Sequence, residues 1–269
     1  MRLFQIDQRM EYPLSVFKAG PFKIRCTYAR SRETRQGKDT GQDYITYKLT
    51  DDGIFFCVCD GVSQSFFGNL AAKYLGDSML QFMSDSDCFN SMDQKYIAYR
   101  LQSRLQQMTI QATSLINRYE IPPHISGFLR EVLEEKRTKG SETTFVCGKI
   151  MYSAVKKKGQ ITAAWLGDTR LRIFGQGHEV PGLINGEFSQ WNRWSTCQGV
   201  TGQAPYILAV DFEKGTGGPD CVQIFTDGLL ECRKLQHSPD DAELRRMIAV
   251  SDNHAASDDI SFLEISWNE

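Results

Sequence analysis

Apolar residues along this chain occur mainly in short runs that end at glycine or at a charged residue. The clearest run covers residues 54–59, between Gly53 and the pair Asp60-Gly61. A short apolar run that is rich in β-branched and aromatic residues and bounded by turn formers is typical of a buried strand. Residues 45–49 form a similar run, and the turn at 51–53 between the two predicts a strand pair.

Further runs predict more strands and several helices. Strands are expected at residues 143–151, 160–166, 171–174, 206–210, 222–226 and 260–266. Helices are expected at 69–83, at 127–136 and directly after Asp227. A further helix is predicted to begin at an N-cap, Ser238, and to run to residue 250, because Pro239 would occupy its first position.

The longest regular element is a helix that ends before Pro122-Pro123. Apolar residues recur there every three or four positions and mark one face: Ile97, Leu101, Leu105, Met108, Ala112, Leu115 and Tyr119. This periodicity indicates an amphipathic helix packed on a core. We interpret the stripe of methionine and aromatic residues as core packing and not as a cofactor site.

The order of the elements bears on the fold class and the domain organisation. Strands and helices come in blocks instead of alternating strictly, which favours an α+β fold with antiparallel sheets. The first twenty or so residues are expected to form an extra edge strand or an arm. Residues 175–218 are rich in glycine, tryptophan and polar residues and are expected to be an irregular insert holding one strand, 206–210. We interpret residues 1–269 as a single domain.

Acidic residues mark the ends of several expected strands. Asp60, Asp168 and Asp227 each follow a strand, and Asp258-Asp259 precedes the last one. One aspartate at a strand end is usually only a turn residue. If the strands are antiparallel neighbours, however, these carboxylates converge and repel one another unless a cation compensates. Hard divalent cations bound by oxygen ligands provide that compensation.

Composition narrows the class of protein. The net charge of -2 gives no support for a nucleic-acid-binding surface, and no segment is apolar enough for a membrane span or a signal peptide. Eight scattered cysteines without a Cys-x-x-Cys pair indicate reduced thiols and a cytoplasmic protein. The one local basic stretch, residues 25–38, is typical of a solvated loop, with a binding role as the alternative.

Six short motifs occur in a fixed order: Gly41-Gln42-Asp43, Asp60-Gly61-Val62, Gly140-Ser141-Glu142-Thr143-Thr144, Gly167-Asp168-Thr169-Arg170, Thr226-Asp227-Gly228 and Ser257-Asp258-Asp259-Ile260-Ser261. Together they resemble the motifs of the metal-dependent type 2C serine/threonine protein phosphatases, and most closely those of the short bacterial members. The resemblance spans residues 25 to 265. It implies two stacked antiparallel sheets with helices outside, and a flap-like subdomain at about 175–218 that borders the active site.

The resemblance also implies a reaction, its cofactors and its partners. The reaction is hydrolysis of phosphoserine or phosphothreonine in proteins by a hydroxide that bridges two Mn²⁺ or Mg²⁺ ions. The substrate would be a phosphorylated protein, and the enzyme would oppose a serine/threonine kinase.

Motif by motif, the resemblance assigns the metal ligands. Asp60 would bridge the ions and the Gly61 carbonyl would ligate one of them. Asp227 and Asp258 would complete the first site, and Asp43 would support the second. A third, weaker ion would lie at Asp168 and Glu231, although Glu231 is as readily interpreted as a helix-face carboxylate.

Several positions depart from the family pattern. Gln42 stands where an acidic residue is common, and Lys38 stands where a phosphate-binding arginine is typical, with Arg35 as its alternative. Val62 replaces a histidine, so no general acid is evident, and Asp259 replaces an asparagine. These departures support a second hypothesis, in which the chain is a catalytically weak or inactive member that serves as a regulatory phosphoprotein-binding module. We favour the enzyme, because no core carboxylate is missing.

Overall fold

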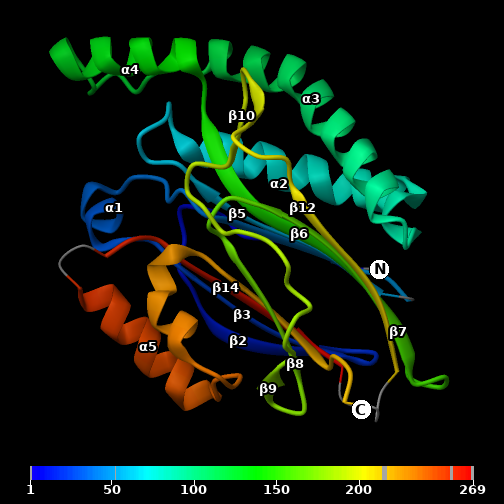
Figure 1. Ribbon diagram of the computed structural model, residues 1–269. Coiled ribbons are helices and arrows are strands. Elements are labelled where there is room, and N and C mark those ends of the chain that lie inside the picture. Colours follow the sequence, from blue (N-terminus) through cyan, green and yellow to red (C-terminus); the bar gives the residue numbers. More distant parts are fainter. Residues whose placement is uncertain (1, 52, 214–216, 255–256, 268–269) are drawn as a thin grey trace.

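Two antiparallel sheets lie face to face, with helices on both outer surfaces (Figure 1). The computed structural model describes residues 2–51, 53–213, 217–254 and 257–267. Every strand pair between the described strands is antiparallel. The α+β class and the layered sandwich predicted for this chain are therefore confirmed.

The first sheet has eight strands. Six of them are neighbours in the order β1 (Arg2–Gln5), β4 (Tyr44–Leu49), β5 (Gly53–Gly61), β6 (Glu142–Ser153), β10 (Arg193–Ser195) and β11 (Gly199–Thr201). The other two branch from β6, which also pairs with β7 (Lys158–Leu166), and β7 in turn pairs with β12 (Tyr206–Glu213). β5 is buried along nearly its whole length, because α2 packs on one face and the other faces the second sheet. This double burial explains why its sequence is a continuous apolar run.

The second sheet has six strands. In spatial order they are β2 (Tyr12–Ala19), β3 (Phe22–Ala29), β14 (Ile260–Ser266), β13 (Cys221–Phe225), β8 (Arg170–Gly175) and β9 (His178–Glu179). Side chains such as Ile24, Ile224 and Leu263 point from it into the core shared with the first sheet. The order places β13 and β14 side by side although their sequences are separated by two helical segments.

Helices cover the two outer faces unequally (Figure 1). On the eight-stranded side lie α2 (Gly68–Asp85), the short η1 (Asp87–Asn90), α3 (Gln94–Arg118) and α4 (Gly127–Lys139). On the six-stranded side lie α1 (Arg32–Gly37), η2 (Asp227–Lys234) and α5 (Asp241–Asn253). Leu244 and Met247 of α5 pack on Phe225 and Phe262, which closes a second, smaller core.

The predicted stripe on the long helix is correct up to Ala112 and wrong at Leu115. Leu115 is 40% exposed, whereas Ile116 is fully buried beside Phe66 and Ile121. A helix of 3.6 residues per turn that buries Met108 and Ala112 next brings residue 116 to the same face.

The N-terminal part of the chain is more regular than its sequence indicates. The expected edge strand is present as β1, and β2 is an edge strand of the other sheet. The basic stretch 25–38 is not a loop, because it contains the end of β3 and the helix α1. Arg25 is buried and pairs with Glu264 at 2.6 Å. A buried ion pair with a partner 239 positions away leaves no signal in the local sequence.

The insert 175–218 also holds more strands than expected. Its predicted strand 206–210 is longer, as β12, and pairs along its length with β7. Three further strands, β9, β10 and β11, have two or three residues each, which is too few for a hydrophobic alternation to appear. Residues 214–218 are a glycine-rich stretch that the sequence predicts to be a turn, since no helix follows it as a phosphate-binding loop would require, and they lie largely outside the described residues.

The last helix begins two residues later than predicted. Asp240 is its N-cap, and its carboxylate accepts a hydrogen bond from the Glu243 amide at 2.8 Å. Ser238 is engaged elsewhere, since its hydroxyl contacts Gln223 and Glu264 in the buried network around Arg25. The competing tertiary contact thus decides the start of the helix.

Two further features concern the cysteines and the apolar character of the helices. All eight cysteines are free, and Cys57 and Cys59 lie on one face of β5 with their sulfurs 3.6 Å apart. Among the described residues, no helix combines the length and the apolar character that a membrane crossing requires.

Candidate functional site

The strand ends that carry acidic residues meet at one edge of the sandwich. β5 ends beside the start of β6, where Asp60 pairs with Thr144, and β13 ends beside the start of β14, where Phe225 pairs with Phe262. A pocket of about 210 Å³ opens at this edge. It is lined by Gln42, Asp60, Gly61, Val62, Ser63, Gln64, Thr144, Asp168, Gln190, Trp191, Arg193, Asp227 and Asp258.

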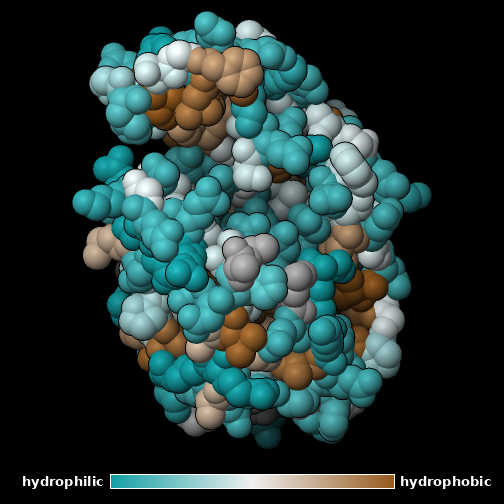
Figure 2. Space-filling view, turned by 90° about the vertical axis from the view of Figure 1, so that its left-hand side faces the viewer, coloured by the Kyte–Doolittle hydropathy of each residue, from teal (hydrophilic) through white to brown (hydrophobic). Residues whose placement is uncertain are grey.

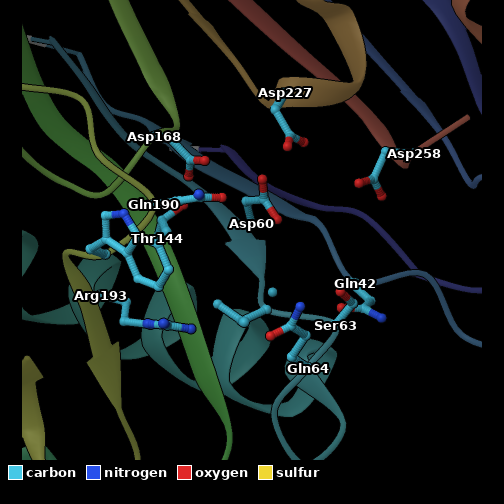
Figure 3. Close-up of a pocket in the computed structure, with 13 residues that line it drawn as sticks. Gln42, Asp60, Ser63, Gln64, Thr144, Asp168, Gln190, Arg193, Asp227 and Asp258 are labelled. Atoms are coloured by element: carbon cyan, nitrogen blue, oxygen red, sulfur yellow. The ribbon is translucent and has the colours of Figure 1, made fainter. Parts of the chain in front are cut away.

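Four carboxylates face this pocket from both sheets. Asp60 comes from the end of β5, Asp168 follows β7, Asp227 begins η2, and Asp258 lies just before β14. Their carboxyl groups point toward a common space (Figure 3). The predicted convergence is therefore present. Within each sheet, antiparallel strands bring ends and starts to the same edge, and the face-to-face packing of the two sheets brings the two edges together.

The electrostatics of the pocket are unfavourable for four ionised carboxylates. Burial raises the pKa of Asp60 well above its usual range, and the charges of Asp227, Asp168 and Asp258 raise it further. Burial, with Asp258 and Asp168, raises the pKa of Asp227 to about 6. Among the described residues that line the pocket, only Arg193 is positively charged. The pocket therefore favours cations, which would compensate the buried negative charge and let Asp60 ionise.

Asp43 lies behind the pocket and not in its lining. Its carboxylate is 2% exposed and accepts a hydrogen bond from the Thr226 hydroxyl at 2.7 Å. Burial raises its pKa well above the usual range, and the charge of Asp60 adds to the effect. The neighbouring Gln42 lines the pocket instead, and its side-chain oxygen is buried without a hydrogen-bond partner among the described residues.

Asp259 acts as a brace for the segment that carries Gln42 and Asp43. Its carboxylate is buried and accepts hydrogen bonds from the backbone amides of Ser31, at 2.6 Å, and of Gln42. Asparagine at this position would present one amide oxygen in place of two carboxylate oxygens. The departure from the family pattern at Asp259 thus has a structural role in fixing the loop before β4.

The glycine after Asp60 is required by a close backbone crossing. A Cβ atom on Gly61 would lie 2.5 Å from the carbonyl carbon of Gly68 at the start of α2. Gly228, after Asp227, is similar, since its Cβ would lie 2.0 Å from the carbonyl oxygen of Asp259. These two glycines therefore let separate segments approach closely enough to place the aspartates around one pocket.

Three of the predicted site residues do not line the pocket. Asp43 is buried behind it, Glu231 lies on η2 but is not part of the lining, and Lys38 is exposed at the C-terminal end of α1. Arg35, the alternative to Lys38, forms an ion pair with Asp252 of α5. Of the predicted set, the pocket brings together Asp60, Gly61, Asp168, Asp227 and Asp258.

Other pocket residues were not found from the sequence. Gln190, Trp191 and Arg193 come from the insert 175–218, and Ser63 and Gln64 come from the loop before α2. None of them belongs to a motif whose spacing points to chemistry. The position of Gln190, Trp191 and Arg193 depends on β10, which pairs with β6 and with β11.

The donor set suits a hard divalent cation. The pocket offers four carboxylates and the unpartnered Gln42 oxygen, while none of the described lining residues is a histidine or a cysteine. Oxygen-only ligation is the preference of Mg²⁺ and Mn²⁺. Within the described ranges, however, no three His, Cys, Asp or Glu side chains come together closely enough to hold an ion. The carboxylates thus surround the pocket without meeting at one point.

Comparisons with known proteins identify the fold. No protein-family model and no curated protein sequence matches the chain. Among solved structures, the serine/threonine phosphatase Stp1 from Staphylococcus aureus aligns with a TM-score of 0.58 and 12% identity over 91% of this chain and 95% of that one. A bacterial serine phosphatase gives 0.57 and 13% over 91% and 97%. RsbX in complex with magnesium gives 0.52 and 16% over 95% and 100%.

These alignments cover nearly the whole of both chains in each pair. The fold is therefore that of the type 2C phosphatases, as the ordered motifs indicated. At 12–16% identity the likeness concerns the fold alone, and the chemistry depends on the side chains of the pocket.

Proposed function

We propose that this protein is a metal-dependent phosphatase that hydrolyses phosphoserine or phosphothreonine in proteins. The observation that carries the proposal is the pocket in which Asp60, Asp168, Asp227 and Asp258 converge on a type 2C phosphatase-like fold. A pocket with four carboxylates and one guanidinium repels a phosphate ester. It becomes a phosphate site only when cations occupy it.

Two divalent ions would be held mainly by Asp60, with Asp227 and Asp258 on one side and Asp168 on the other. The Gly61 carbonyl and the Gln42 side-chain oxygen would add neutral ligands. Asp43 is proposed to act through water or through Thr226, because it lies behind the pocket. Glu231 is proposed only as a distant partner of a third ion. When bound, such ions neutralise phosphoryl oxygens and lower the pKa of a coordinated water.

The chain's own side chains would then orient the substrate. Gln190, Gln64 and Ser63 line the pocket with uncharged hydrogen-bonding groups. Such groups position an anion without adding to the negative charge. The described lining residues include no histidine that could protonate the leaving alkoxide, so bulk water would supply that proton.

The setting of the pocket favours a protein substrate. Trp191 lines it and is 70% exposed, which offers an aromatic surface beside the place where a phosphorylated side chain would enter. We propose Mg²⁺ or Mn²⁺ as the cofactor, a single domain over residues 1–269, and a partner kinase whose products the enzyme reverses. Eight free cysteines are in keeping with a reducing compartment such as the cytoplasm.

The proposal is tested with metal-stripped protein and a phosphothreonine peptide. Phosphate release is followed while Mn²⁺ or Mg²⁺ is titrated, for the wild type, for Asp60→Asn and for the control Asp211→Asn. Asp211 is an exposed carboxylate on β12 outside the pocket. We expect saturable, metal-dependent turnover in the wild type and in Asp211→Asn, and a loss of at least about 100-fold in Asp60→Asn.

Two results would contradict the proposal. Equal turnover by Asp60→Asn and the wild type would remove the pocket from the reaction. A wild type that binds metal and phosphopeptide but releases no phosphate would instead support the regulatory binding module.

A further inference from the structure

The phosphate site proposed above needs a cation from the protein, and the two basic residues suggested by the sequence are elsewhere. Lys38 caps the C-terminal end of α1 with a left-handed backbone (φ 58°), is exposed, and is not part of the pocket lining. Arg35 is paired with Asp252 on the outer side of the six-stranded sheet. Neither side chain faces the carboxylates.

Arg193 lines the pocket, which Lys38 and Arg35 do not. It is the cationic residue among the described residues of the lining, and its guanidinium faces the pocket from the side opposite the four carboxylates (Figure 3). If a phosphoryl group lay between the carboxylates and Arg193, metal ions would contact its oxygens on one side and the guanidinium would contact them on the other. This arrangement suits the charge of a phosphate ester, which is spread over three oxygens.

Within the described ranges, one ion pair, to Glu142, holds the Arg193 guanidinium in place. Arg193 Nη1 lies 2.9 Å from Glu142 Oε2, and both side chains are largely shielded, at 23% and 22% exposure. Glu142 begins β6, two residues before Thr144, and Thr144 is the residue that pairs with Asp60. One strand therefore positions both the cation, through Glu142, and the central carboxylate.

The ion pair leaves donors for a ligand. The contact with Glu142 uses Nη1, whereas Nε and Nη2 donate no hydrogen bond to any residue in the described part of the chain. A guanidinium presents its remaining N–H groups as a planar fork that matches two oxygens of a phosphate. The backbone around Arg193 is fixed as well, because its carbonyl accepts a hydrogen bond from the Thr201 hydroxyl at 3.1 Å.

We propose that Arg193, supplied by the insert and oriented by Glu142, is the phosphate-binding cation of this site. It would take the role that the family resemblance gives to the position of Lys38. The inference rests on the proposed phosphatase function, and it assigns the insert a direct part in substrate binding. Glu142 is a positioning residue that acts through Arg193.

The test combines kinetics with a binding measurement. The variants are Arg193→Met, Arg193→Lys, Glu142→Gln and Lys38→Met, each checked for its melting temperature and for Mg²⁺ affinity by calorimetry. Turnover of p-nitrophenyl phosphate is measured for each, and inorganic phosphate is titrated calorimetrically into the Mg²⁺-loaded proteins. Inorganic phosphate reports on the anion site without requiring catalysis.

We expect Arg193→Met to weaken phosphate binding and to lower kcat/KM by about 10- to 100-fold, with Mg²⁺ affinity unchanged. Arg193→Lys should recover part of the loss, because lysine restores the charge without the fork. Lys38→Met should remain within about 2-fold of the wild type, since its side chain lies outside the pocket. Glu142→Gln, which can still accept a hydrogen bond, should lose less than Arg193→Met.

The outcomes separate this inference from the proposed function. A wild type without turnover sinks the phosphatase proposal, while the phosphate titration still tests Arg193. If the wild type is active and Arg193→Met binds phosphate as tightly as the wild type, or if Lys38→Met shows the larger loss, the inference is overturned. A larger loss of phosphate affinity in Glu142→Gln than in Arg193→Met would show that Glu142 does not act through Arg193 and would also overturn it.

Discussion

Replacing Asp227 with asparagine should stabilise the metal-free protein. Burial and the charges of Asp258 and Asp168 raise the pKa of Asp227 to about 6, against an ordinary 3.8. Keeping this carboxylate ionised at pH 7.5 therefore costs about 3 kcal/mol relative to water. Asparagine removes that cost, and for a chain of this length the melting temperature should rise by about 6–12 °C at most.

The stability gained by Asp227→Asn should increase with pH. Between pH 3.8 and about 6 the folded wild type keeps a proton on Asp227 that the unfolded chain has lost. The stability contributed by this group is therefore complete below pH 3.8 and is lost as the pH rises through 6. The advantage of Asp227→Asn should shrink from about 3 kcal/mol at pH 7.5 to about 1 kcal/mol at pH 4.5.

Urea unfolding in the presence of a chelator, at both pH values, measures these differences, with the exposed Asp211→Asn as a matched control. Repeating the series with Mg²⁺ should reverse the order, because the ion stabilises only the form that retains its ligands. The reasoning is refuted if metal-free Asp227→Asn is no more stable than the wild type at pH 7.5. It is also refuted if Mg²⁺ stabilises both proteins equally.

Three further changes test other parts of the structure. Arg25→Ala leaves Glu264 buried without its partner and should lower the free energy of unfolding by about 3–5 kcal/mol in urea titrations, and a loss below 1 kcal/mol would contradict the buried pair. Gly61→Ala places a Cβ atom 2.5 Å from Gly68 and should weaken Mg²⁺ binding in calorimetry; unchanged affinity would show that the crossing can relax. Trp191→Ala should raise KM several-fold for a phosphopeptide and leave p-nitrophenyl phosphate turnover unchanged, whereas equal effects on both substrates would exclude a role in peptide recognition.

An exposed apolar surface on α4 lies apart from the pocket. Phe128 is 80% exposed and Leu129 is 57% exposed, and no residue of this helix is buried. Hydrophobic residues gather over the same end of the molecule in the space-filling view (Figure 2). None of the described residues of α4 lines the pocket.

The strands and their acidic ends could be predicted from the sequence because both are local features. The run at 54–59 ends at Asp60, and the observed β5 and its terminal pair follow directly from that pattern. Motif order added the stacked sheets, and antiparallel geometry added the convergence of Asp60, Asp168, Asp227 and Asp258. The strands need only the period of a strand and the direction of its neighbours, whereas the stacking of the two sheets came from the family resemblance and not from local reasoning.

Tertiary structure alone decided which other side chains enter the pocket. Arg193 reaches it because three-residue β10 pairs with β6, and strands so short carry no alternation that a sequence could reveal. Asp43 belongs to one of the ordered motifs and Lys38 precedes that motif, yet Asp43 is buried behind the pocket and Lys38 is exposed outside it. Spacing along the chain determines which residues are near a strand end, whereas the packing of loops against distant segments determines which way their side chains face.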